Sequence, residues 1–90
     1  MTRENLQEAS QHLESAAEAA ENDDARERLH EQSDQLARLA DRERGPDHGR
    51  LARHESAISD VADEEGGEVA EHVEAALSAI HAYRETIEGV

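Results

Sequence analysis

Apolar residues recur every three or four positions in the first half of the chain, the spacing of one helix face. The first set is Leu6, Ala9, Leu13, Ala16, Ala17 and Ala20. It predicts a helix that Thr2 caps and that ends near Glu21. The second set is Ala25, Leu29, Gln32, Leu36, Leu39 and Ala40. The polar residues Asn22, Asp23 and Asp24 predict the break between these helices and offer caps for the second one, and Asp24 with Glu27 has capping-box spacing.

The segment Gly45-Pro46-Asp47-His48-Gly49 breaks the pattern at the middle of the chain. Gly can adopt the left-handed conformation that ends a helix, and Pro cannot continue one. A third helix is predicted to begin at Pro46 or Asp47 and to stop at Gly66-Gly67. It turns Leu51, His54, Ile58, Val61 and Ala62 inward. The fourth helix has the clearest heptad spacing: Val69, Val73, Ala76, Ile80, Tyr83 and Ile87.

These four segments predict an all-α fold, an antiparallel up-down four-helix bundle made of two helical hairpins. We expect one helical domain over residues 1–90. Hairpin 1 covers about 2–44, hairpin 2 covers about 46–88, and the breaker at 45–49 separates them. The two halves resemble each other in their apolar spacing, as a duplicated hairpin or as a chance likeness of amphipathic helices.

Composition makes this bundle unusual. The 90 residues include 23 acidic side chains, nine arginines and no lysine, for a net charge of −14. Half of the apolar residues are alanine, and Tyr83 is the one aromatic residue, so the core is thin. Self-repulsion at this charge density opposes folding in dilute buffer, but molar salt screens it. We therefore expect a halophilic protein from a salt-rich cytoplasm.

Several classes of protein fit poorly. Without cysteine the chain has no disulfide, thiolate nucleophile or redox motif. We expect no membrane span, since no apolar run approaches the roughly 18 residues required. The first residues lack the apolar stretch of a signal peptide, which favours a cytoplasmic location. The net charge and the near absence of aromatic residues make nucleic-acid binding unlikely except through a local phosphate contact.

Three stretches carry a resemblance to a known group. They are the opening Met-Thr-Arg-Glu-Asn-Leu-Gln-Glu-Ala-Ser, the central Gly-Pro-Asp-His-Gly-Arg-Leu-Ala-Arg and the closing Ala-Tyr-Arg-Glu-Thr-Ile-Glu-Gly-Val. The chain resembles, over its whole length, a group of short acidic haloarchaeal proteins classed as a domain of unknown function. The resemblance implies a haloarchaeal source and a helical fold. It implies no activity, ligand or site residue.

Positive charge is concentrated in residues 38–54, which contain five arginines and three acidic residues. Cations at a helix C-terminus complement its dipole, which accounts for Arg42 and Arg44. Arg50 and Arg53 lack this explanation because they lie near a helix N-terminus. The candidate interaction surface consists of Arg38, Arg42, Arg44, His48, Arg50 and Arg53. It would bind an acidic partner or a phosphate, or its arginines would pair with glutamates of neighbouring helices.

The histidines suggest little chemistry. Glu27 and His30 have the Glu-x-x-His spacing of di-iron bundles. That site needs two such pairs facing the core, and this one pair lies off the apolar face. We therefore expect no metal and no cofactor. His54 lies in the apolar seam and is the candidate pH-sensitive residue, because burial would lower its pKa.

No nucleophile–base pair and no phosphate loop is visible, so we expect no enzyme. The sequence predicts a non-catalytic bundle that acts through protein–protein contacts, as an adaptor or regulator, with a protein partner or as a homodimer. The alternative is an anion- or nucleic-acid-phosphate-binding module that uses the arginine cluster around the central Gly-Pro loop.

Overall fold

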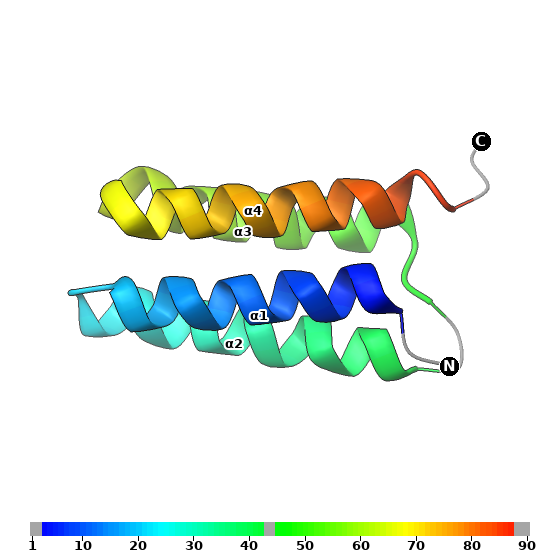
Figure 1. Ribbon diagram of the computed structural model, residues 1–90, viewed down its shortest axis with the longest axis horizontal. Helices are drawn as coiled ribbons and strands as arrows, with labels where there is room; N and C mark the ends of the chain where they lie inside the picture. The colour runs from blue at the N-terminus through cyan, green and yellow to red at the C-terminus, as the bar shows by residue number, and fades with distance from the viewer. Residues whose placement is uncertain (1–2, 43–44, 88–90) are drawn as a thin grey trace.

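The computed structural model describes residues 3–42 and 45–87, which form four helices (Figure 1). They are α1 (Glu4–Ala19), α2 (Asp23–Asp41), α3 (His48–Glu65) and α4 (Gly67–Arg84). Successive helices run in opposite directions, so the predicted all-α up-down bundle of two hairpins is confirmed. Within these two ranges, no helix combines the length and the apolar character needed to cross a bilayer.

The helix ends follow local chemistry. The Asn22 side chain accepts the backbone N–H of Ala25 at 3.1 Å, so Asn22, one of the three residues expected to offer a cap, caps α2, and the capping-box pair of Asp24 and Glu27 does not supply the N-cap. Asp47 caps α3 in the same way. Gly66 ends α3 with φ of 64°, a left-handed conformation that glycine adopts without strain.

Two predicted ends differ from the structure. Helix α1 ends at Ala19, two residues before the predicted Glu21, because the backbone of Ala20 is already extended. At the other end of α1, Arg3 takes the N-cap position without a side-chain cap, and the predicted cap, Thr2, lies outside the described residues.

The core consists mainly of the predicted apolar seams, of which Ala62, Tyr83 and Ile87 are only partly buried against it. Its larger side chains are Leu6, Leu13, Leu29, Leu36, Leu39, Leu51, Ile58, Val61, Val69, Val73 and Ile80. In α2 the buried polar residue is Ser33 and not the predicted Gln32, which is half-buried. The Ser10 hydroxyl donates to the Ser33 carbonyl at 2.8 Å, and the Ser33 hydroxyl donates to the Ser10 carbonyl at 2.9 Å. This exchange lets α1 and α2 approach closely without leaving a buried hydroxyl unpaired.

The four helices do not pack equally. Helix α1 packs closely against both α2 and α4, whereas α2 and α3 make the loosest contact of the neighbouring pairs. The cause is chemical, because polar residues occupy the facing positions: Arg28, Gln32 and Gln35 in α2, and Arg50, Arg53 and His54 in α3. Such side chains cannot interdigitate as an apolar seam does, and a groove opens between the two helices.

Arg3 ties together the end of the bundle where this groove begins. Its backbone N–H donates to the Ala40 carbonyl at 3.0 Å, and its Nε donates to the Tyr83 hydroxyl at 3.1 Å. Gly45 of the α2–α3 linker lies against both side chains, so closely that a Cβ there would come within 2.7 Å of Arg3 Nε and nearer still to the Tyr83 hydroxyl. The start of α1, the end of α2, the linker and α4 therefore meet at one point.

Candidate binding groove between α2 and α3

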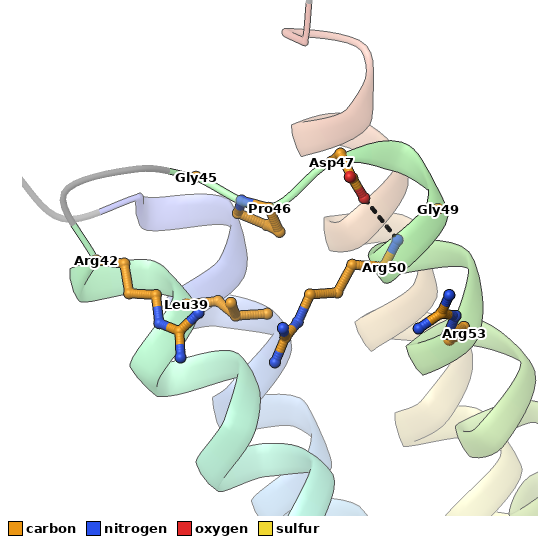
Figure 2. A pocket seen from close by; sticks show the side chains of 8 residues that line it. All are labelled: Leu39, Arg42, Gly45, Pro46, Asp47, Gly49, Arg50 and Arg53. Atoms are coloured by element: carbon orange, nitrogen blue, oxygen red, sulfur yellow. Dashed lines mark hydrogen bonds between the residues drawn. The ribbon is translucent and has the colours of Figure 1, made fainter.

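The hollow between α2 and α3 has two continuous parts. The larger, of about 640 Å³, lies at the linker end and is lined by Leu39, Arg42, Gly45, Pro46, Asp47, Gly49, Arg50 and Arg53 (Figure 2). The smaller, of about 320 Å³, is lined by Gln32, Gln35, Arg50, Arg53 and His54. Because Arg50 and Arg53 line both parts, the two form one trough, which we call the arginine groove.

Arginines form the walls of this groove and apolar side chains form its floor. Arg42 of α2 and Arg50 of α3 extend from opposite walls into the space above Leu39, and Arg53 lies about one turn further along α3 (Figure 2). Leu39 and Pro46 are buried beneath them. An occupant would therefore meet guanidinium groups at its sides and hydrocarbon below.

The three groove arginines have no side-chain partner among the described residues. Across residues 3–42 and 45–87, no ion pair or hydrogen bond engages the side chain of Arg42, Arg50 or Arg53. Other arginines are paired: the guanidinium nitrogens lie 2.9 Å from a carboxylate oxygen in Arg26–Asp23, 3.0 Å in Arg28–Glu64 and 2.6 Å in Arg84–Glu55. The interpretation that arginines bridge to glutamates of neighbouring helices therefore holds for Arg28 and Arg84, but not for those of the groove.

Among the described residues that line the groove, Asp47 is the one carboxylate, and it caps α3. Asp47 Oδ1 accepts the backbone N–H of Arg50 at 2.8 Å and so caps α3. Its charge complements the positive end of the helix dipole. The carboxylate lowers the positive potential at the linker end of the groove without forming an ion pair with any of the three guanidinium groups.

His54 lies at the inner end of the groove and connects its two walls. Its Nδ1 lies 2.6 Å from Gln32 Oε1, and the residue is 6% exposed. An amide oxygen only accepts hydrogen bonds, so this contact assigns the proton of the neutral ring to Nδ1. Burial lowers the pKa of His54 below its ordinary value of 6.5, and the positive charge of Arg50 lowers it further.

Two further described residues of the predicted surface, His48 and Arg38, do not line the groove. His48 faces α4, where its Nδ1 accepts from Arg84 Nε at 3.0 Å. Arg84 also donates to Glu55, which contacts His81 at 2.8 Å, so His48 belongs to a network on the other side of α3. Arg38 is exposed and lines neither part of the groove. Arg44 lies outside the described residues.

Sequence reasoning missed the neutral residues of the groove. Gln35 and Leu39 were not part of the predicted surface, although both line the groove, whereas Pro46 lies in the central Gly-Pro loop around which the arginine cluster was predicted. A signal was present: Arg28, Gln32, Gln35, Leu39 and Arg42 follow one another at steps of four and three, a mostly polar seam beside the apolar one. Such a second seam indicates a helix face that meets a neighbour without a continuous apolar contact.

The histidine pair considered for metal binding lies elsewhere. Glu27 and His30 are exposed on α2. In the part of the chain that the structure describes, no three His, Asp or Glu residues are grouped so that they could hold a metal ion.

Fold and groove together define a small all-α bundle that carries a cationic groove within an acidic surface. Residues 1–86 match the model of a family described as "Family of unknown function (DUF7553)", and the chain belongs to this family. No curated protein and no solved structure matches the chain.

Proposed function

We propose that this protein is a non-catalytic helical module that acts through protein–protein contacts, as an adaptor or regulator, and that the arginine groove receives an acidic segment of its partner. One observation carries the proposal: Arg42, Arg50 and Arg53 converge on a groove and have no side-chain partner among residues 3–42 and 45–87, in a protein of net charge −14. With acids this abundant, three unpaired neighbouring cations are better explained by a ligand than by charge balance.

Guanidinium groups suit this role. Arginine binds carboxylates through paired N–H donors in fixed geometry, and such charge-assisted bonds are stronger than neutral ones. At contact distance, where even molar salt screens charge only in part, acidic side chains elsewhere on the surface disfavour an acidic partner, so the groove is the favoured place of contact.

The proposed setting is a salt-rich, haloarchaeal cytoplasm. It is supported by the excess of 23 acidic over nine basic residues and by arginine in place of lysine. The core is built from few large side chains, and burial of further apolar surface against a partner, or against a second copy in a homodimer, would add stability.

The alternative is an anion- or nucleic-acid-phosphate-binding module. The guanidinium groups favour it, because they bind phosphate as well as carboxylate. Two observations weigh against a nucleic acid. The overall charge repels a polyanion, and the hydroxyl of Tyr83, the one aromatic residue, is engaged by Arg3 away from the groove lining.

The test compares two charge-matched double variants in capture from a salt-rich lysate. Arg50→Ala/Arg53→Ala removes two groove arginines, and Arg26→Ala/Arg38→Ala removes two arginines outside the groove, the half-buried Arg26 with its ion pair to Asp23 and the exposed Arg38. We expect the wild type and the control to retain a common protein that the groove variant loses. Identical retention by all three would contradict the proposal. Nucleic acid retained on filters by the wild type and lost by the groove variant would favour the alternative.

A further inference from the structure

We infer that the occupant of the arginine groove is a short acidic peptide segment that carries an apolar side chain beside its carboxylates. This inference rests on the proposed function and specifies the partner's chemistry. It follows from the order in which cationic, apolar and neutral polar groups are arranged along the groove.

The cationic part requires more than one carboxylate. Arg42 and Arg50 approach from opposite walls, and Arg50 and Arg53 are three residues apart, on the same side of α3. A helix rises 1.5 Å per residue, so these two positions are separated by about 4.5 Å along the axis of α3. Neighbouring acidic side chains of one segment can reach both guanidinium groups, and a single carboxylate cannot neutralise all three.

The floor favours an apolar group. Leu39 and Pro46 are almost wholly buried and add little exposed area of their own, so the gain comes from the partner's hydrocarbon, at roughly 25 cal/mol per Å² of its apolar surface removed from water against them. A free inorganic anion cannot use this surface. A peptide with a leucine-like side chain between its acids can.

The inner part of the groove offers amide groups. Gln32 and Gln35 line it, and the Gln32 oxygen already accepts from His54, which leaves the Gln32 NH₂ group as a donor. Side-chain amides match the alternating donors and acceptors of a peptide backbone. The groove thus offers partners to the carboxylates, the apolar side chain and the backbone amides of an acidic peptide.

Carboxylate is favoured over phosphate by Asp47. Its carboxylate lines the same part of the groove as Arg42 and Arg50, and repulsion from it is stronger for a phosphate dianion than for a carboxylate. The groove also lacks an aromatic residue on which a base would stack, since its lining consists of aliphatic, glycine, proline and polar residues.

Fluorescence anisotropy with defined peptides tests the inference, at the lowest salt concentration at which circular dichroism shows the helices fully formed. The probe is a labelled ten-residue peptide of alternating Glu and Leu. Matched probes replace every Glu by Gln, or every Leu by Ser. Inorganic phosphate and a ten-nucleotide thymidine strand serve as competitors.

We expect the Glu–Leu peptide to bind the wild type. We expect affinity to fall at least tenfold for the Gln peptide, and severalfold for the Ser peptide. Arg50→Ala/Arg53→Ala should lose at least tenfold, whereas Arg26→Ala/Arg38→Ala should stay within about twofold. A tenfold loss corresponds to about 1.4 kcal/mol.

Three results would overturn the inference: no binding of the Glu–Leu peptide, equal binding of the Glu and Gln peptides, or tighter binding of phosphate or the oligonucleotide. Its failure is distinguishable from that of the proposed function. If the groove variant loses a captured protein but no acidic peptide binds, the protein-binding module stands and the peptide chemistry is wrong. If acidic peptides bind but capture does not depend on the groove, the adaptor role fails.

Discussion

His54 joins the two helices that pack least closely. Its ring donates to Gln32 across the α2–α3 contact and lies almost wholly out of solvent. A neutral imidazole tolerates this position, but an imidazolium would be buried near Arg50, whose positive charge lowers the pKa of His54 in addition to burial. The inward position was predictable from the seam spacing, whereas the partner on α2 was not, because helix spacing does not specify which residue lies opposite.

We predict that stability depends on pH through His54. Because its pKa is lower in the folded state, the unfolded state binds the proton more readily. The stabilising contribution is complete above the unfolded pKa of about 6.5 and is lost as the pH falls toward the folded pKa. Urea unfolding of the wild type and His54→Gln between pH 8 and pH 5 measures it.

The variant also serves as the control for the many carboxylates, because their titration affects both proteins alike. The free energy of unfolding of the wild type should therefore fall with acidification relative to that of His54→Gln. Parallel curves over this range would show that His54 is not the titrating group.

At the scale of elements, α1 and α2 are joined by two serines that exchange hydrogen bonds. Ser10 and Ser33 each donate to the other's carbonyl, and their hydroxyl oxygens lie 2.9 Å apart. We predict that Ser10→Ala or Ser33→Ala lowers the free energy of unfolding by about 1 kcal/mol. The double variant should cost less than the two single losses combined, by about 0.5 kcal/mol or more, because the sites contact each other.

Chemical denaturation of the four proteins of this cycle measures the coupling. Ser56→Ala, at an exposed position on α3, is the matched control and should change stability by less than about 0.5 kcal/mol. Strictly additive losses at Ser10 and Ser33 would show that the two hydroxyls act independently.

The helices themselves were predictable and their pairing was predictable only in part. Regular Leu, Ile and Val spacing predicts four amphipathic helices, and Gly66 and Pro46 mark where they are interrupted. Gln32 was expected inside, and Ser33 is there. The two positions are adjacent at the edge of the same stripe, and a serine of α1, 23 positions away in sequence, decides between them.

The groove, like the pairing of the helices, was predictable from the sequence only in part. The arginine cluster was visible in the sequence, but a groove exists only where polar positions of α2 face polar positions of α3. His48 separates from Arg50 for a related reason, since two residues along a helix correspond to a rotation of about 200° at 3.6 residues per turn. Their side chains therefore face different neighbours.

For the whole molecule, charge sets the conditions of folding. The net charge of −14 resides mainly on exposed side chains, and the buried positions are apolar except for Ser10, Ser33 and His54. We predict that helix content rises with salt, because molar salt reduces the Debye length to about 3 Å and screens repulsion between helices. Circular dichroism at 222 nm in dilute buffer and in 2 M potassium chloride measures this.

A charge-reduced variant tests the cause. Glutamine in place of Glu8, Glu18, Glu31 and Glu71 removes four exposed negative charges without removing an ion pair between described residues. The variant should reach full helix content at a lower salt concentration than the wild type. Equal helix content of the wild type in dilute buffer and at 2 M salt would contradict the prediction.

The contact between Arg3 and Tyr83 has a consequence for the order of synthesis. It joins residues 80 positions apart, so it can form only after the ribosome has added the last turns of α4. Gly45, at the linker end of the arginine groove, packs against both side chains. A nascent chain that holds α1, α2 and α3 therefore already contains every groove arginine. Gly45 of the linker, however, can pack against the Tyr83 hydroxyl only once Tyr83 has been added. The groove is therefore completed only after Tyr83 has been added, later than the synthesis of all the residues that line it.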